Sequence, residues 1–150
     1  MNKIPTWAKF YLYGLQGIFT EVVYTALYDT IADKNRKLIG VSSVWAFLIY
    51  AASHLVIEKM SAFLIKKNIS ILFRAFVYVL WTFVWEFSTG FILQMFNACP
   101  WYYEFSYNFM GLVTLEYAPL WYIGSIFAEQ VTIPCVNSLH FISFKQSKKM

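Results

Sequence analysis

The sequence predicts an all-α integral membrane protein, a bundle of four transmembrane helices with both termini in the cytoplasm. Three observations lead to this expectation: the composition, four long apolar stretches, and the distribution of Lys and Arg between them. Hydrophobic residues make up 59% of the 150 residues and charged residues 13%, whereas water-soluble domains are about 45–50% apolar and about 25% charged. A soluble domain of this length would lack the polar surface to cover itself. The composition therefore excludes soluble enzymes, disordered chains and disulfide-rich secreted scaffolds.

A membrane helix needs about 20 apolar residues to cross a hydrocarbon core of roughly 30 Å. Stretches that meet this requirement lie at about residues 7–28, 40–57, 69–96 and 109–133. The first is not expected to be a cleavable signal peptide, because it is too long and contains Gln16 and Glu21. The fourth contains Pro119, which is expected to free the carbonyl of Leu115 inside the helix. The chain is thus expected to be a single transmembrane domain over residues 1–150, with a short basic cytoplasmic tail.

The orientation follows from the Lys and Arg residues that flank these stretches, because short cytoplasmic loops carry the excess of basic residues. One side holds Lys34, Arg36 and Lys37. The other side holds a larger set: Lys3, Lys9, Lys59, Lys66, Lys67, Arg74, Lys145, Lys148 and Lys149. This difference predicts cytoplasmic termini. Because the basic residues form separate clusters between apolar runs, a nucleic-acid partner is not expected.

Three acidic residues fall inside the predicted spans, where an ionisable side chain is costly and is a functional candidate. Glu21 and Glu86 are each expected about 16 Å from the cytoplasmic side, and Glu116 about 20 Å. The three carboxylates are therefore expected to share one layer, and no Lys or Arg is expected at that depth. Such a layer requires that some carboxyl groups stay protonated or that a cation neutralises them.

Small and hydrogen-bonding residues share helix faces with these acids, which predicts that the carboxylates point into the bundle. We expect a polar pocket that opens toward the lumen and holds a proton, a metal ion or a cationic headgroup. The alternative is that protonated glutamates only hydrogen-bond the helices together. The residues expected to support the pocket are Ser42, Trp45, Thr82, Thr89, Asn97, Trp101, Tyr103 and Asn108.

The connection at residues 97–108 is rich in aromatic residues. It is expected either to belong to an interfacial aromatic belt or to cover the pocket, where Trp101, Tyr102 and Tyr103 could stack on a cationic headgroup. Cys99 and Cys135 are expected on opposite sides of the membrane and therefore unpaired. Glu129 is expected near the inner end of the fourth span, in reach of water and structural in role.

Several runs of sequence resemble the transmembrane protein 229 family. They are WTFVWEFSTGFIL at 81–93, FNACPW at 96–101, FMGLVTLEYA at 109–118 and GVSSVWAFLIY at 40–50. The resemblance extends over about residues 7–131, and the family is similar to bacterial membrane proteins classed as small, type IV ABC-transporter permeases. It implies a multi-pass membrane protein related to permeases, with motif positions at Glu21, Glu86, Trp101, Gly111 and Glu116. The chain departs from the family at Tyr102, where members usually have Asp, and at Gln16, where many have His.

These observations lead us to expect a non-enzymatic multi-pass membrane protein with a permease-like, small-ligand-binding or lipid-binding role. Four helices are few for a complete transport path, so homo-oligomers or partner membrane subunits are expected beside the lipid bilayer. The alternatives are an intramembrane lipid-modifying enzyme, and a structural or assembly subunit without a ligand. An enzyme would need a nucleophile or metal beside the acids, and neither His nor Cys is expected at that depth. The sequence identifies no cofactor, cargo or organelle.

Overall fold

The computed structural model describes residues 2–34 and 36–141 and is mostly helical. The long helices are α1 (Thr6–Ala32), α2 (Val44–Lys66) and α3 (Ile71–Met95). A fourth helical stretch consists of α4 (Ala118–Phe127), a π-helical segment η2 (Ala128–Thr132) and α5 (Ile133–Ser138). The expected cytoplasmic tail with Lys145, Lys148 and Lys149 lies outside the described residues.

Among the described residues, four short strands form two antiparallel pairs outside the helices. β1 (Asn2–Lys3) pairs antiparallel with β4 (His140–Phe141), with Lys3 opposite His140, so both ends of the described chain lie together. β2 (Asn108–Phe109) and β3 (Val113–Thr114) form a hairpin before the short 3₁₀ helix η1 (Leu115–Tyr117). Gly111 has a φ of +69° in the connection of this hairpin, a conformation that glycine adopts without steric cost.

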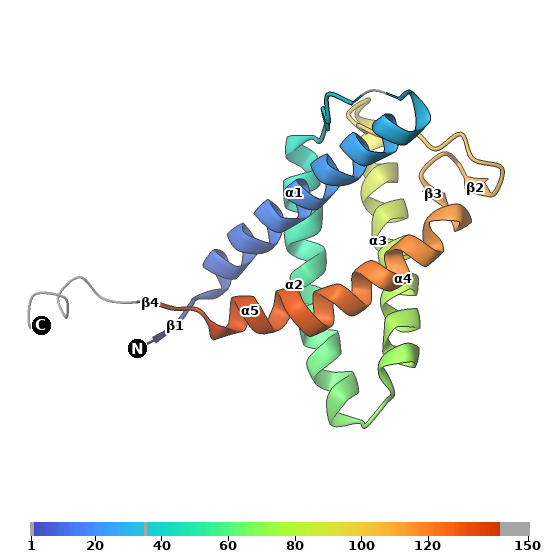
Figure 1. The fold of residues 1–150 in the computed structure, drawn as a ribbon. Coiled ribbons are helices and arrows are strands. Elements are labelled where there is room, and N and C mark those ends of the chain that lie inside the picture. The colour runs from blue at the N-terminus through green and yellow to red at the C-terminus, as the bar shows by residue number, and fades with distance from the viewer. Residues whose placement is uncertain (1, 35, 142–150) are drawn as a thin grey trace, which may run out of the picture.

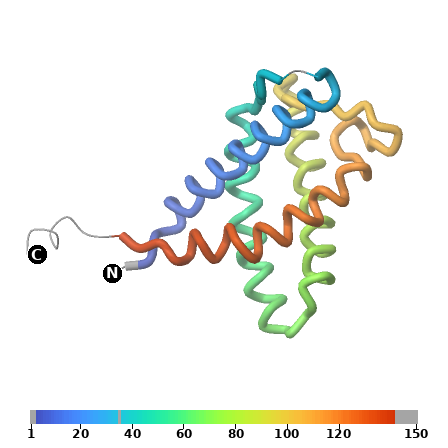
Figure 2. Tube along the Cα trace, in the orientation of Figure 1, coloured from blue at the N-terminus to red at the C-terminus, as the bar shows by residue number. Residues whose placement is uncertain are grey.

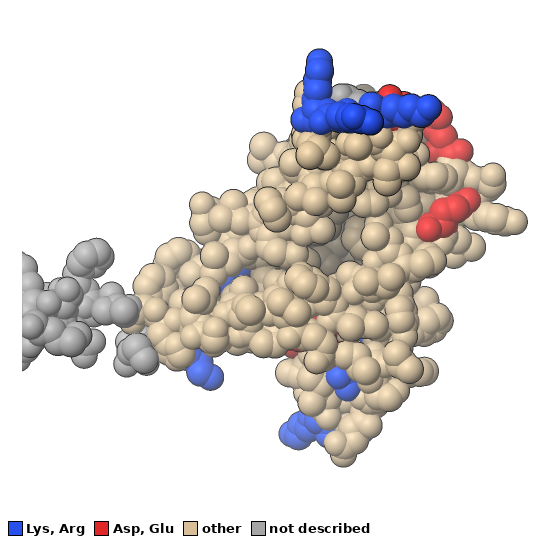
Figure 3. Space-filling view, viewed as in Figure 1, with Lys and Arg blue, Asp and Glu red and all other residues tan. Residues whose placement is uncertain are grey.

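Figure 1 shows α2 and α3 as an antiparallel hairpin, with α1 lying obliquely across α2 and the fourth helical stretch crossing α3 and then α2. The trace in Figure 2 shows the β1–β4 pair on the same half of the molecule as the α2–α3 turn, and the α1–α2 and α3–α4 connections on the other half. The surface is hollowed between α1 and α4 (Figure 3).

Single residues next to α2 and α3 explain where these helices begin or end. Ser43 caps α2, because its hydroxyl accepts from the backbone N–H of Ala46 at 3.2 Å, which satisfies one of the unpaired donors of the first turn. Beyond the last turn of α2, Asn68 has a φ of 55°, and beyond α3, Asn97 has a φ of 53°. Asn tolerates this left-handed conformation better than most residues, so both helices can reverse direction there.

Two helices of the described chain, α2 and α3, are long and apolar enough to cross a membrane. Their 23 and 25 residues correspond to about 34 and 37 Å of helix. Large apolar side chains such as Leu72, Phe76 and Val84 are exposed along α3. On the face drawn in Figure 3, most charged atoms lie toward the two ends of this hairpin and the surface between them is largely uncharged. Such a surface fits a hydrocarbon environment.

The fourth predicted span needs correction. The helix was expected over residues 109–133, but residues 109–117 form the β2–β3 hairpin and η1, and the helix starts at Ala118. Pro119 lies in the first turn of α4, where its missing N–H is tolerated and its fixed φ suits a helix start. The carbonyl of Leu115 is not free, because it accepts from the N–H of Ala118.

Another proline shapes the end of this stretch. In η2 the N–H of Ile133 donates to the carbonyl of Ala128, five residues back, as in a π-helix. Pro134 follows directly and cannot donate to the carbonyl of Gln130. The helical path continues through this wider turn into α5, and Glu129 in η2 accepts a hydrogen bond from Arg74 of α3.

The buried core lies where α1, α2, α3 and α5 cross. Its members are Tyr13, Ile57, Tyr78, Ile133 and Val136. The rings of Tyr13 and Tyr78 are fully buried, but their hydroxyl groups reach charged partners: Tyr13 donates to Glu58 at 3.0 Å and Tyr78 donates to Glu129 at 2.5 Å. The core therefore contains buried hydrogen bonds, and the loss of either partner would leave an unpaired polar group at a cost in stability.

Candidate functional site

Glu86 lies on α3 and faces the loop that follows this helix. The hydroxyl of Tyr103 donates to Oε1 of Glu86 at 2.6 Å. Burial, and then the adjacent carboxylate of Glu86, raise the pKa of the Tyr103 hydroxyl, so it keeps its proton and acts as a donor. The second carboxylate oxygen, Oε2, is buried and has no hydrogen-bond partner among the described residues. Glu86 thus has one oxygen fixed by Tyr103 and one buried oxygen without a hydrogen-bond donor among the described residues.

The loop reaches Glu86 because it packs closely on the last turns of α3. A Cβ atom at Gly90 would lie 2.8 Å from Cζ2 of Trp101 and 2.9 Å from Cδ2 of Leu112. The indole Nε1 of Trp101 donates to the carbonyl of Leu112 at 3.1 Å, and the N–H of Tyr103 donates to the carbonyl of Gly111 at 2.8 Å. Gly90 therefore makes the close approach possible that places Tyr103 over the acid.

Glu21 lies on α1 and faces the start of α2. The hydroxyl groups of Ser42 and Tyr50 both interact with its carboxylate. The two helices approach closely here, because a Cβ atom at Gly17 would lie only 2.3 Å from Cβ of Tyr50. Small residues of this kind allow close helix contacts in membrane proteins.

Tyr50 links the two acids. Its hydroxyl forms a hydrogen bond with the carboxylate of Glu21, and it interacts electrostatically with both Glu21 and Glu86. The two carboxylates also interact electrostatically with each other. Among the described residues, hydroxyl groups act on these carboxylates, and the carboxylate of Glu21 acts on Glu86; no basic side chain of the described chain does so. Glu21 of α1 and Glu86 of α3 thus interact electrostatically, and each has hydroxyl partners; the two acids are hereafter called the glutamate pair.

Aromatic rings cover one side of this site. The ring of Tyr117 packs edge-on against Tyr103 at 5.1 Å and against Tyr24 at 5.8 Å, measured between centroids. Phe105 lies 5.3 Å from Tyr117 and Tyr28 lies 6.2 Å from Tyr24. These rings come from α1, η1 and the loop before β2, so they hold the elements around Glu86 together.

Glu116 does not join the glutamate pair. It lies in η1, is exposed, and accepts hydrogen bonds from the Thr114 hydroxyl and from the backbone N–H of Tyr107 at 3.0 Å. The bond from Thr114 and those from the backbone hold the pKa of Glu116 below its ordinary value. The expected layer of three acids is thus wrong in this respect. The expectation assumed a helix through residues 109–117, and the hairpin places this carboxylate elsewhere.

The eight residues expected to support the pocket divide into three groups. Ser42 and Tyr103 contact the acids directly. Trp101 supports the loop without touching a carboxylate in any described contact. The remaining side chains bond locally or face outward: Thr82 and Thr89 donate to carbonyls of α3, Asn108 bonds within its turn, and Trp45 and Asn97 are exposed.

Sequence reasoning missed Tyr50, Tyr24 and Tyr117. A signal for Tyr50 was present, because Ala46, Tyr50 and Ser53 follow helical spacing on one face of α2. Tyr117 could not be found in this way, since its position depends on the non-helical η1 segment.

Two ion pairs lie apart from the glutamate pair. Nζ of Lys9 lies 2.6 Å from Oε1 of Glu58 and 2.5 Å from Oδ1 of Asn137, which joins α1, α2 and α5. Nη2 of Arg74 lies 2.5 Å from Oε1 of Glu129, and Nε of Arg74 donates to Oε2 at 2.8 Å. Glu129 was expected to reach water, but it is only 4% exposed and its carboxylate accepts hydrogen bonds from Arg74 and Tyr78.

Within residues 2–34 and 36–141, no group of three or more His, Cys, Asp or Glu side chains is placed to hold a metal ion. His54 stacks on Tyr13 at 5.4 Å, and its Nδ1 lies 3.0 Å from the carbonyl of Tyr50. No family model matches the chain, and no solved structure matches its fold.

Proposed function

We propose that this chain is a multi-pass integral membrane protein whose glutamate pair binds a proton or a small cationic ligand in a permease-like role. In this proposal α1, α2, α3 and the fourth helical stretch all cross the bilayer, and both termini lie in the cytoplasm. The observation that carries the proposal is the pairing of Glu21 and Glu86 among hydroxyl groups without a basic partner. Two carboxylates in such surroundings need a proton or another cation.

The topology is supported by the arrangement of the basic residues. Lys66 and Lys67 lie at the α2–α3 turn, on the half of the molecule that holds the β1–β4 pair (Figure 1). At the opposite end, Lys34 and Lys37 follow α1, whose last turns and C-cap carry Asp29 and Asp33. An excess of basic residues near the turn and the termini favours the cytoplasm for that side.

A second candidate function is purely structural. The bonds from Tyr103 to Glu86 and from Ser42 to Glu21 connect different elements, so the same carboxylates could serve only to lock the fold. One feature favours the ligand-binding role: the buried oxygen Oε2 of Glu86 has no hydrogen-bond donor among the described residues, and a purely structural role would leave it without a partner.

The test measures cation binding by protein purified in detergent, with radiolabelled sodium and choline as separate probes. Variants Glu21→Gln and Glu86→Gln are compared with Glu104→Gln, an exposed acid in the same loop as Tyr103. We expect Glu21→Gln and Glu86→Gln to remain folded by circular dichroism and size exclusion and to lose binding of at least one probe at least tenfold, with Glu104→Gln unchanged. Equal binding by all variants would contradict the proposal, and loss of fold in Glu21→Gln and Glu86→Gln would favour the structural role.

A further inference from the structure

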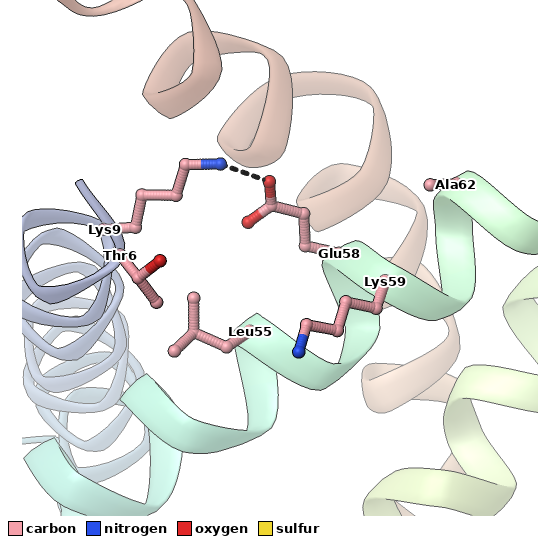
Figure 4. Close-up of a pocket in the computed structure, with 6 residues that line it drawn as sticks. All are labelled: Thr6, Lys9, Leu55, Glu58, Lys59 and Ala62. Carbon is pink, nitrogen blue, oxygen red and sulfur yellow. Dashed lines mark hydrogen bonds and ion pairs between the residues drawn. The ribbon is translucent and has the colours of Figure 1, made fainter. Parts of the chain in front are cut away.

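A pocket lies between the first turns of α1 and the second half of α2, away from the glutamate pair. It has a volume of about 190 Å³ and is lined by Thr6, Lys9, Leu55, Glu58, Lys59 and Ala62 (Figure 4). Leu55 and Ala62 provide apolar surface, and the remaining side chains provide polar groups at its edges. We propose that this pocket binds the headgroup of an anionic phospholipid through its phosphate, in preference to a phosphatidylcholine headgroup, in which choline balances the phosphate charge.

The charge of the pocket favours an anion. Lys9 and Lys59 contribute two ammonium groups, and Glu58 contributes one carboxylate, which Lys9 already neutralises at 2.6 Å. Lys59 is exposed and has no carboxylate partner among the described residues. Its side chain runs back along α2 toward Leu55, into the same space (Figure 4). The pocket thus has one positive charge that no side chain of the described chain balances.

The hydrogen-bond donors of the pocket suit a phosphate group. A lysine ammonium has three N–H donors. Lys9 uses two of them, toward Glu58 and Asn137, and these contacts hold its ammonium in place. The third N–H, the ammonium of Lys59 and the hydroxyl of Thr6 remain as donors for phosphate oxygens. Figure 4 shows the Thr6 hydroxyl directed toward the space between the two helices.

The position of the pocket favours a membrane lipid as the source of the phosphate. This step rests on the proposed topology, in which the first turns of α1 lie at the cytoplasmic surface, where anionic lipids are concentrated. Trp7 follows the pocket residue Thr6 in the sequence and is 68% exposed, and its ring centroid lies 6.0 Å from that of Phe141. Tryptophan is typical of the headgroup layer, because its ring is both apolar and polar. The alkyl stems of Lys9 and Lys59 can then lie along the lipid while their ammonium groups meet the phosphate.

The experiment purifies the full chain from nanodiscs of phosphatidylcholine with a minor fraction of phosphatidylserine, and quantifies the retained lipids by mass spectrometry. Lys59→Gln removes the unbalanced charge from an exposed position, and Lys66→Gln makes the same charge change on α2 outside the pocket. We expect Lys59→Gln to reduce the enrichment of phosphatidylserine about fivefold, the weight of one basic side chain at an anionic surface, with Lys66→Gln close to wild type.

Three outcomes would overturn the proposal. Unchanged enrichment in Lys59→Gln would show that the pocket does not select the lipid. Equal losses in Lys59→Gln and Lys66→Gln would show only diffuse attraction to the surface. Displacement of phosphatidylserine by millimolar inorganic phosphate would identify a free phosphate as the ligand. Glu86→Gln should retain normal enrichment, so failure of the glutamate-pair function leaves this result unaffected.

Discussion

At the scale of single residues, Glu86 and Tyr103 form the best-defined contact of the candidate site. The hydroxyl–carboxylate distance is 2.6 Å, and the two residues lie 17 positions apart on α3 and the loop after it. A hydrogen bond to a charged group contributes about 1.5–3 kcal/mol when its surroundings exclude water. This contact therefore fixes both the acid and the loop that covers it.

Tyr103→Phe should lower the free energy of unfolding by about 1–2 kcal/mol, because Glu86 loses its donor while the ring packing against Tyr117 remains. Denaturant unfolding in detergent, followed by tryptophan fluorescence, would measure this change. The matched control is Tyr102→Phe, whose ring is 66% exposed. An equal loss of stability in both variants would show that the hydrogen bond from Tyr103 to Glu86 does not contribute to the free energy of unfolding beyond the loss of any tyrosine hydroxyl.

The space available for a side chain differs between the helix glycines Gly17 and Gly124. At Gly17 a Cβ atom would lie 2.3 Å from Cβ of Tyr50, whereas at Gly124 no atom lies within 4 Å. Gly17→Ala should therefore destabilise the fold by about 1–3 kcal/mol through overpacking between α1 and α2. Gly124→Ala should be neutral or stabilising by up to about 1 kcal/mol, because alanine favours helices. Thermal unfolding of the two variants would test this, and a similar response in both would contradict the close helix approach.

At the scale of secondary-structure elements, the two ion pairs connect helices that are distant in sequence. Lys9 and Glu58 are 49 residues apart, and Arg74 and Glu129 are 55 residues apart. In the second pair the side chain of Glu129 is 1% exposed. Such a buried pair stabilises little by itself, but removal of one partner leaves an uncompensated charge.

Arg74→Gln should therefore cost about 3–5 kcal/mol and greatly reduce the yield of monodisperse protein in fluorescence-detected size exclusion. The double variant Arg74→Met with Glu129→Met should recover most of that yield, because no buried charge remains. Lys66→Gln, which changes the same charge at an exposed position, serves as the control. Normal yield for Arg74→Gln alone would show that Glu129 is solvated or neutral.

The sequence predicted some of these elements and contacts but not others. Apolar length predicted helices that overlap α2 and α3. That Glu21 and Glu86 share a site, as their estimated depths and the small residues on their helix faces suggest, stays a prediction. The fourth span was placed too early, because residues 109–117 are apolar enough for a helix and the pattern does not show the turn at Gly111. The ion pairs were not predictable, since no local spacing encodes contacts across 49 or 55 residues.

At the scale of the whole molecule, the proposal fixes which ends of the helices face the cytoplasm. The α2–α3 turn and the β1–β4 pair lie on one half, and the β2–β3 hairpin lies on the other (Figure 2). The three basic residues that follow α1 lie between α1 and α2 on the second half. The topology is therefore testable with single reporter positions at the two ends.

Cysteine labelling in intact cells should distinguish these ends after Cys99 and Cys135 are replaced by Ser. Lys67→Cys at the α2–α3 turn should react with a membrane-impermeant maleimide only after the plasma membrane is permeabilised. Tyr107→Cys before β2 should react without permeabilisation if the protein is at the cell surface, or after permeabilisation of organelle membranes otherwise. Equal accessibility of both positions, or the reverse order, would contradict cytoplasmic termini.

The most direct measurement for the whole account is a double-mutant cycle on Glu21 and Glu86. Free energies of unfolding are measured in detergent for Glu21→Gln, Glu86→Gln and the double variant, with Glu86 and exposed Glu104 as the control pair. We expect a coupling of at least about 0.5 kcal/mol between Glu21 and Glu86 if the carboxylates share one site as proposed, and additive effects for the control pair. Additivity for Glu21 and Glu86 within about 0.3 kcal/mol would show that the two acids act separately.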